Sequence, residues 1–473
     1  MAMATFSYPH GNSYLVAAVG LVLAIQSLPS LFILGISFLS YWCVDIAWSY
    51  CCVSSPTCNK IHNRIMSMYH QLDAYVTKHF LRDPRDFGYF IFVVATCIWY
   101  PLIFIAAAYR CYHYGLDWTT VVLYHWCRIG PSFRLLTHLH VFLHKEGHCP
   151  KGGFFKNFTR DDDSSCVDQE SISSSNKPAL SNSSSRDNHS SQQKWTKEQL
   201  FSYIPIASLF NHNIGQWFLG IFNGHIPGSY FISHNKIHHV HHNSLEDVHT
   251  TMDLDRTLWL SILIYMTRFA LFWNNLTPMI YFMKRQDYRK VFHLVIGFVY
   301  YYFWTATCWY WMGFSFTYWF MIMPQIEAIY FVGTNAFIWH AFVDPKDPTN
   351  PHVNSITIVN STDNVWGEDY HVIHHFNYRQ IHWKDAHSHY EKNKELYRLG
   401  SVFKNCVEAQ LLIWLLLGNF DAIAECWDEG EEFTITDGSE NKQLTRNQFS
   451  HEEKVRILKE RARFVVSNKS VDE

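Results

Sequence analysis

Residues 88–109 have the sequence GYFIFVVATCIWYPLIFIAAAY, which contains no charged side chain. A helix needs about 20 consecutive, mostly apolar residues to cross the hydrocarbon layer of a membrane. This run therefore predicts a membrane span, with a kink at Pro101 because proline cannot donate the backbone hydrogen bond of a helix interior. The alternative is a buried core helix of a soluble protein, and the length of the uncharged run argues against it.

Four further apolar stretches accompany this run. They are residues 14–48, interrupted by Gln26 and Pro29; residues 257–273, which contain Arg268; residues 291–312; and residues 316–342. The first stretch follows a segment without lysine or arginine and is too long for a signal peptide. We interpret it as a retained anchor of one or two spans.

Polar segments divide the chain into three parts. We expect an N-terminal membrane anchor with a cytosolic linker at residues 1–84, a membrane domain at residues 85–420, and a solvated cytosolic C-terminal tail at residues 421–473. In the tail, Ser450 and Glu453 match a helix capping box. The serine-rich residues 158–197 cannot bury enough apolar surface to fold, and they predict a disordered insertion within the membrane domain.

The composition excludes several classes of protein. The 38 basic and 41 acidic residues leave a net charge of −3, which provides no basic surface for nucleic acid. The 12 cysteines show no CxxC spacing, so neither a zinc ribbon nor a disulfide framework is indicated. Histidine is abundant at 29 residues, and it is the side chain that most often binds metals.

The histidines are concentrated in three clusters, each beside an apolar stretch. His140, His144 and His148 are four residues apart, so a helix would place them on one face. The second cluster is HNKIHHVHH at residues 234–242, in which a histidine precedes a histidine pair by one helical turn. The third is HVIHH at residues 371–375, which on a helix can address two neighbouring metal ions.

Three clusters together indicate a metal site, whereas a single HxxxH is more often an ordinary surface or core feature. Many polar side chains at a membrane boundary are costly, and a bound metal stabilises them together. Imidazole suits iron, zinc, copper and nickel alike. The ligand number favours two irons that activate dioxygen, because structural zinc takes four ligands whereas eight or more imidazoles imply two metals with open positions.

The order of the clusters resembles that of a known superfamily. HKEGH at residues 144–148, HNKIHH at 234–239 and YHVIHH at 370–375 are similar to the three histidine boxes of the membrane fatty acid desaturase and hydroxylase superfamily. That family often has one further iron-binding histidine at the end of the span before the third box, the place that His340 occupies. The resemblance covers roughly residues 85–400.

The resemblance implies an all-α, multi-span integral membrane protein with a cytosolic helical cap that carries a di-iron site. The implied iron ligands are His144, His148, His234, His238, His239, His340, His371, His374 and His375. The first box leaves two pairings open, His140 with His144 or His144 with His148. The family pattern favours the second pairing, because Glu146 and Gly147 lie between its two histidines.

The implied function is a membrane-bound fatty acid desaturase, which uses O2 and two irons to introduce a double bond into an acyl-lipid or acyl-CoA chain. The alternative within the superfamily is a hydroxylase or monooxygenase acting on a lipid, sterol or carotenoid. No flavin or haem motif is evident, so electrons must come from outside the chain, and the resemblance implies cytochrome b5 or ferredoxin with its reductase. The expected location is the endoplasmic reticulum membrane, with the active site facing the cytosol.

Outside the superfamily, the alternative is a histidine-rich membrane protein that binds or transports metal. Its ligands would be expected at mid-membrane depth, whereas all but His340 lie outside the apolar stretches. The HExxH motif of zinc proteases is absent from the sequence. The remaining histidines near the clusters are expected to orient ligands or to face solvent: His138, His241, His242, His249, His382, His387 and His389.

A shared di-iron site requires all three clusters on one face of the membrane. Three apolar stretches separate the second cluster from the third, and three crossings would place these clusters on opposite faces. Arg268 and the short length of residues 257–273 favour an interfacial position for that stretch, which leaves two crossings. We therefore predict that tags inserted near residues 170 and 390 are equally accessible from the cytosol in a protease-protection assay. Opposite accessibility would rule out a shared site.

Overall fold

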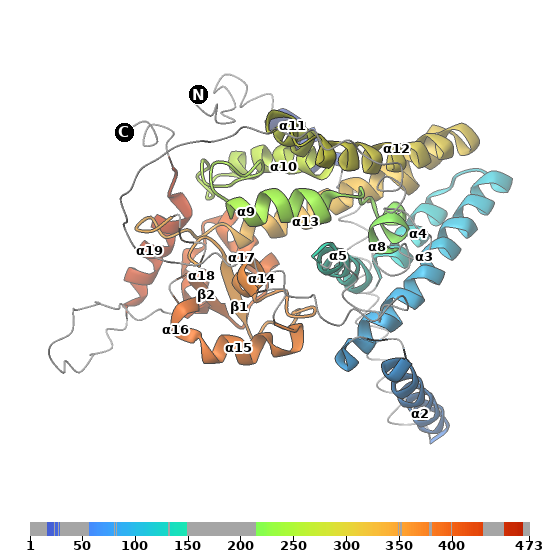
Figure 1. Ribbon diagram of the computed structural model, residues 1–473, viewed down its shortest axis with the longest axis horizontal. Helices are drawn as coiled ribbons and strands as arrows, with labels where there is room; N and C mark the ends of the chain where they lie inside the picture. The colour runs from blue at the N-terminus through green and yellow to red at the C-terminus, as the bar shows by residue number, and fades with distance from the viewer. Residues whose placement is uncertain are drawn as a thin grey trace, which may run out of the picture.

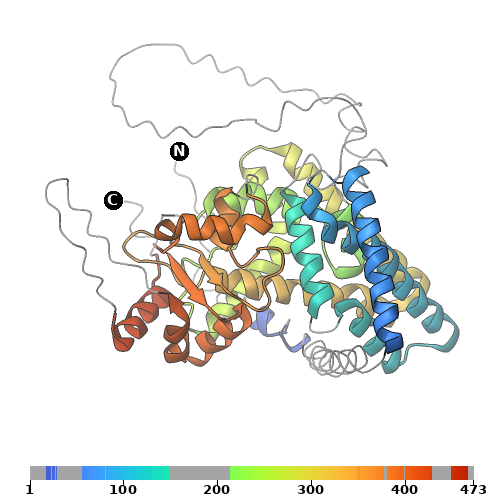
Figure 2. The same cartoon turned by 90° about the horizontal axis from the view of Figure 1, so that it is seen from below.

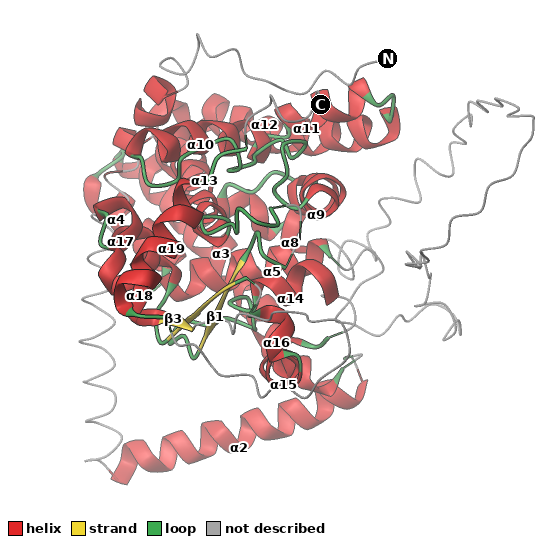
Figure 3. Ribbon diagram, turned by 90° about the vertical axis from the view of Figure 1, so that its left-hand side faces the viewer, coloured by secondary structure: helices red, strands yellow, loops and turns green. Residues whose placement is uncertain are grey.

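The computed structural model of the protein describes residues 17–22, 24–26, 28, 56–79, 81, 83–130, 133–148, 214–348, 350, 352–377, 381–398, 400–428 and 449–466. The serine-rich insertion and most of the apolar stretch at residues 14–48 lie outside these residues. Helices predominate in the described chain, as predicted, and a small sheet accompanies them (Figure 1 and Figure 3).

Helices make up both halves of the described chain. The first half contains α2 (Pro56–His79), α3 (Phe87–Tyr114), α4 (Trp118–Ile129), α5 (Arg134–Gly147), α8 (Ile214–Trp217), η4 (Leu219–Asn223), η5 (Ser229–His238), α9 (His239–His241), α10 (Trp259–Trp273) and α11 (Leu276–Lys284). The second contains α12 (Tyr288–Thr317), η6 (Tyr318–Ile322), α13 (Met323–Trp339), α14 (His371–Asn377), α15 (Ala386–Lys392), α16 (Lys394–Tyr397), α17 (Glu408–Leu417), α18 (Phe420–Cys426) and α19 (His451–Arg463). Two short 3-10 turns, η2 (Pro84–Asp86) and η7 (Trp383–Asp385), complete the set.

Two helical segments of the described chain are long and apolar enough to cross a membrane, Pro84–Tyr114 and Tyr288–Trp339. In the most apolar 18-residue part of each segment, only 22% and 17%, respectively, is buried inside the protein. Most of these apolar side chains therefore face outward. In the first segment, α3 continues through Pro101. The chain then turns at Gly115, whose φ of 78° favours glycine, and α4 returns along α3, as the bond from Trp99 Nε1 to the Cys127 carbonyl (2.9 Å) shows. The sequence analysis did not predict α4.

The second segment folds back on itself. Gly313 has a φ of 80° and a ψ of 173°, outside the helical region, so α12 ends effectively there. The Tyr301 hydroxyl donates to the Met321 carbonyl at 2.9 Å, and Tyr302 approaches Gln325 at 3.5 Å. Residues twenty positions apart would lie about 30 Å apart on one straight helix, so these bonds require a reversal. The two arms correspond to the stretches predicted at residues 291–312 and 316–342.

Helix α10 forms from the stretch at residues 257–273 and packs against α13 in the main core. Its Arg268 forms a bidentate pair with Asp253, at 2.7 Å to each carboxylate oxygen. The pair neutralises the one charge within this apolar helix. With 15 residues, α10 is shorter than a full span, and its interfacial position stays a prediction.

Residues 421–428 and 449–466, the described part of the expected C-terminal tail, are folded onto the body of the protein and do not form a solvated tail. A small sheet pairs β1 (Ile356–Val359) in parallel with β2 (Ser401–Lys404), and β2 antiparallel with β3 (Trp427–Asp428). Helix α19 begins with the predicted capping box of Ser450 and Glu453. It buries Leu458 and Ala462 completely, because its apolar face packs against α18 and the main core (Figure 2).

The second histidine cluster is positioned by a close approach between α12 and the loop before η5. A Cβ atom at Gly297 would overlap the carbonyl oxygen of Pro227, which also accepts a hydrogen bond from Asn275. We predict that Gly297→Ala destabilises the protein by about 1–3 kcal/mol, because the added methyl group overpacks this contact. Gly88→Ala is the control, since its methyl group would meet open space on the exposed side of α3. Thermal unfolding in detergent should separate the two variants, and equal melting temperatures would contradict the close approach.

Candidate metal centre

The first cluster lies on α5, whose C-terminal end brings His144 and His148 into the interior. Both side chains are buried, at 5% and 3% exposure. Their rings lie 5.0 Å apart, as expected for residues separated by one helical turn. Glu146 lies between them on the opposite side, where it accepts hydrogen bonds from the backbone nitrogens of Gly215 and Gln216 at 3.0 Å each. These bonds fix the end of α5 against α8.

The second cluster lies on η5, a π-helix in which the backbone bonds reach one residue further than in an α-helix. His234 and His239, five residues apart, therefore share one face, and their Nε2 atoms lie 2.9 Å apart. His238 points instead toward His340, with 3.3 Å between the two Nε2 atoms. The π-helix thus places His234 and His239 together and directs His238 toward a different set of histidines.

The third cluster lies on α14 and is divided in the same way. His374 Nε2 lies 3.0 Å from His239 Nε2. His371 and His375, one turn apart, bring their Nε2 atoms within 3.0 Å of each other. The ring of His371 also stacks on Trp339, at a centroid distance of 4.1 Å, which holds its orientation. His340 completes the arrangement from the end of α13.

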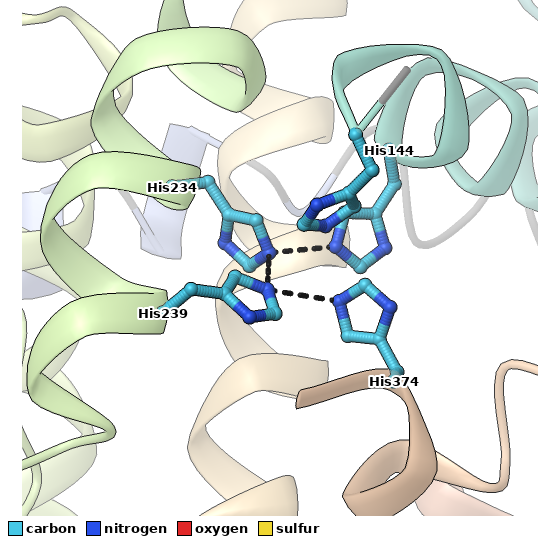
Figure 4. Close-up of side chains that lie close together, drawn as sticks. His144, His234, His239 and His374 are labelled. Carbon is cyan, nitrogen blue, oxygen red and sulfur yellow. Dashed lines mark hydrogen bonds between the residues drawn. The ribbon is translucent and has the colours of Figure 1, made fainter. Parts of the chain in front are cut away.

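All nine histidines predicted as ligands fall into two groups whose ligand atoms lie within 4.8 Å of one another. The first group is His144, His148, His234, His239 and His374 (Figure 4), and the second is His238, His340, His371 and His375. Seven of the nine lie on α5, on the consecutive elements η5 and α9, and on α14, while His148 directly follows α5 and His340 directly follows α13. Figure 4 shows how rings from three of these segments converge on one point.

The hydrogen bonds of the second group settle which ring nitrogens carry hydrogen. His340 Nδ1 lies 2.7 Å from the carbonyl oxygen of Asn354, and since a carbonyl only accepts, Nδ1 is the donor. His238 Nδ1 lies 2.6 Å from the Asp247 carboxylate and donates to it. In the neutral rings both Nε2 atoms then carry lone pairs, and these face each other at 3.3 Å. Two lone pairs repel, so this arrangement fits a cation between them.

In the first group, a carboxylate again lies beside the Nδ1 atom of one of two facing histidines. His144 Nδ1 lies 2.6 Å from Glu368 Oε1, and His144 Nε2 faces His234 Nε2 at 2.7 Å. Burial alone would raise the pKa of Glu368, but His144 and Lys145 lower it to about 2, so the carboxylate is ionised. A carboxylate on the far nitrogen fixes the tautomer of a metal-binding histidine and makes it a better ligand.

Burial favours the neutral form of three rings in the first group, and neutral imidazole is the state that binds a metal. Burial lowers the pKa of His234, His239 and His374 well below its ordinary value, and the neighbouring imidazoles lower it further. Asp247, in contrast, remains ionised: burial alone would raise its pKa, but His249 and His238 hold the pKa well below its usual range. Neutral imidazoles beside ionised carboxylates form a suitable environment for divalent cations.

Sequence reasoning missed the two carboxylates, Asp247 and Glu368. Glu368 lies three residues before the third cluster and Asp247 five residues after the second, so proximity to a histidine cluster was the available signal. His249, expected to be spare, is buried at 3% exposure and lies 3.7 Å from Asp247 through Nε2. His387 remains exposed, and its Nδ1 lies 2.8 Å from the Tyr370 hydroxyl.

The other histidines expected to be spare do not join the two groups. His382 and His389 pair with Asp86 and the Tyr397 hydroxyl, and His241 with the Tyr281 hydroxyl. His242 Nδ1 lies 3.3 Å from His375 Nδ1, beside the second group. His138 bonds the carbonyl of its own helix at Arg134. These five histidine rings therefore contribute to packing and capping.

His140 also lies outside both groups, although it is buried at 3% exposure one turn before His144. Of the two pairings left open for the first box, the structure brings His144 and His148 together with the other ligand candidates. His140 packs instead between Trp273 and Phe331, at centroid distances of 5.9 and 5.7 Å.

A cavity of about 1080 Å³ adjoins the two groups. His144, His234, His238, His340 and His371 line one end of it. Away from these histidines the walls are mostly apolar, and they include Phe269, Phe272, Trp273, Phe331 and Leu136. A largely apolar cavity with convergent polar groups at one end is the usual form of a ligand site.

Comparison with known proteins gives no match: no family model, no curated protein and no solved structure matches the chain.

We predict that Asp247→Asn and Glu368→Gln each weaken metal binding about 10–100-fold, because the amide no longer fixes the histidine tautomer through a charged acceptor. Metal affinity, measured by competition with a chelator, is the readout. Asp363→Asn is the control, since Asp363 is exposed and its hydrogen bond to the Ser361 hydroxyl is donated by its backbone nitrogen, which the substitution leaves in place. Equal affinities for all three variants would show that the carboxylates do not act on the histidines.

Proposed function

We propose that the two histidine groups bind two iron ions and that the protein is an O2-dependent oxidoreductase acting on lipid chains. The observation that carries this proposal is the pair of facing Nε2 lone pairs on His238 and His340, each fixed by a donor bond from its Nδ1. Around His144 in the first group, a carboxylate likewise lies beside Nδ1, and Nε2 faces the Nε2 atom of His234. Two such places side by side support a binuclear centre.

The distances between ligand atoms support a centre with more than four ligand positions. For metal–nitrogen bonds of about 2.1 Å, neighbouring ligands at right angles lie about 3.0 Å apart, and tetrahedral ligands about 3.4 Å apart. The Nε2 atoms of the first group lie 2.7, 2.9 and 3.0 Å apart along the chain of contacts from His144 to His374. Five histidines at this spacing exceed the four ligands of a closed zinc site and fit iron.

The cavity supports a substrate with a long apolar chain. When bound, the metal pair supplies the activation of O2 that removal of hydrogen from an unactivated C–H bond requires. The residues of this chain hold the substrate: the aromatic wall of α10 (Phe269, Phe272 and Trp273) excludes water, and the buried carboxylates Asp247 and Glu368 orient the ligands. These features, together with the order of the histidine boxes, support an acyl desaturase of the membrane fatty acid desaturase superfamily.

A hydroxylase or monooxygenase would use the same centre and the same cavity, so product analysis decides between the two reactions. Transport of a metal ion is the second class of function. The position of the histidine groups opposes transport, because the ligands of a transporter would be expected at mid-membrane depth. The groups lie where α5, η5 and α14 meet, outside α3 and the arms of α12 and α13.

The membrane setting is part of the same proposal. The outward-facing apolar helices α3 and α12 support a chain embedded in a membrane, with α14–α19 and the sheet as its cytosolic cap. Electrons would come from cytochrome b5 or ferredoxin with its reductase, as the resemblance implies. The endoplasmic reticulum, with the centre facing the cytosol, is the proposed location.

We predict close to two irons per chain in protein purified in mild detergent after iron-replete expression. His374→Ala should reduce the iron content and abolish lipid oxidation in expressing yeast, because one ligand of the first group is lost. His387→Ala is the matched control, because this exposed histidine lies outside both groups. Iron is measured by mass spectrometry and lipid products by gas chromatography.

Two outcomes would contradict the proposal. Stoichiometric zinc without iron would show that the histidines form a different kind of site. Loss of activity to the same extent in His387→Ala and His374→Ala, with iron retained in both, would show that the histidine groups do not carry the chemistry.

A further inference from the structure

The cavity is an elongated channel that runs along two helices. On α5, the lining residues recur every three or four positions from Phe133 to His144, so one face of the helix forms a wall about 17 Å long. On α13, lining residues recur from Glu327 to Trp339, which gives a wall of about 18 Å. Both walls end at the histidine groups. The channel therefore begins at the candidate metal centre and extends away from it.

His140 is a polar side chain on the α5 wall of this channel, one helical turn before the candidate ligand His144. His140 lines the cavity and is 3% exposed. Neither of its ring nitrogens has a hydrogen-bond partner among the described residues. On the facing α13 wall, the Thr334 hydroxyl donates to the Tyr330 carbonyl, and Glu327 pairs with Arg128. A buried polar group without a partner is costly, so His140 marks a place where the channel's occupant supplies one.

The chemistry of His140 limits what that partner is. Burial, with Arg128 nearby, lowers the pKa of His140 to about 3, so the ring is neutral with one donor and one acceptor nitrogen. A neutral imidazole in an apolar wall matches a hydroxyl or carbonyl group, whereas a carboxylate or an ammonium group would be buried there without a counter-charge. His140 lies four residues before His144, about 6 Å along the helix axis.

We propose that His140 is a specificity-determining residue, which hydrogen-bonds an oxygen function, a hydroxyl or carbonyl, carried within the substrate chain a few carbons from the carbon that is oxidised. This inference rests on the proposed function, because it takes the channel as the site of a lipid chain. It narrows the substrate class to lipids that bear an oxygen function inside the chain. A simple saturated chain would leave His140 unsatisfied.

His225 provides a matched comparison. It is completely buried, and neither of its ring nitrogens has a hydrogen-bond partner among the described residues. Like His140 it packs beside Trp273, at a centroid distance of 5.2 Å. It does not line the cavity, however. The two residues share burial and lack of partners, and they differ in access to the channel.

The test is equilibrium binding of octadecanoic acid and its mono-hydroxylated positional isomers to the iron-loaded protein in detergent. We expect one isomer, or a few adjacent ones, to bind about tenfold more tightly than octadecanoic acid, since a buried hydrogen bond of this kind is worth about that factor. His140→Leu should remove the preference and leave binding of octadecanoic acid unchanged or tighter. His225→Leu should retain the preference.

Iron content separates this inference from the proposed function. A His140→Leu variant with close to two irons per chain and no isomer preference supports the role of His140. Loss of iron in this variant would make His140 a ligand and overturn the inference, while iron binding by the wild-type protein would still support the proposed function. Equal binding of all isomers by the wild-type protein would overturn the inference by itself, whether or not the variants fold.

Discussion

The structure depends on the convergence of imidazole lone pairs on two buried points. The facing Nε2 atoms of His238 and His340 repel each other as long as nothing positive lies between them. Burial strengthens that repulsion, because the surroundings screen it less than water would. The protein holds the rings in place from behind, through Asp247 and the Asn354 carbonyl. The hydrogen bonds made by the Nδ1 atoms therefore determine where the Nε2 atoms lie. Four separate chain segments meet at these two points.

The division of the histidines between the two groups follows from local helix type. In an α-helix His234 and His238 would share a face and His239 would be turned away, which is what the HxxxHH pattern alone indicates. In the π-helix η5, His234 joins His239 in the first group and leaves His238 to the second. Helix α14 makes the complementary division, because His371 and His375 are one α-helical turn apart while His374 faces the other side. Two different helix types thus supply both groups.

The nine histidines that the structure brings together could be selected from the sequence, because histidine is rare in apolar surroundings and its spacing on a helix can be read locally. The sequence predicted α3 and the two arms of α12 and α13 for the same reason: length and composition are local properties. Glu368 and Asp247 could not be assigned, since an acidic residue in a loop gives no sign of which histidine it will meet. The same holds for α19. Its mean composition is polar, and only contacts with α18 and β2, far away in sequence, show that Leu458 and Arg461 are buried.

Charge balance explains why the carboxylates accompany an otherwise neutral set of ligands. The two divalent cations proposed for the histidine groups would bring four positive charges into a region that is shielded from water. Isolated charges in such a region are strongly disfavoured, whereas paired ones are tolerated. Asp247 and Glu368 are ionised in spite of their burial, and they place negative charge directly behind His238 and His144. The remaining positive charge of the proposed centre would face the apolar channel, where little water screens it.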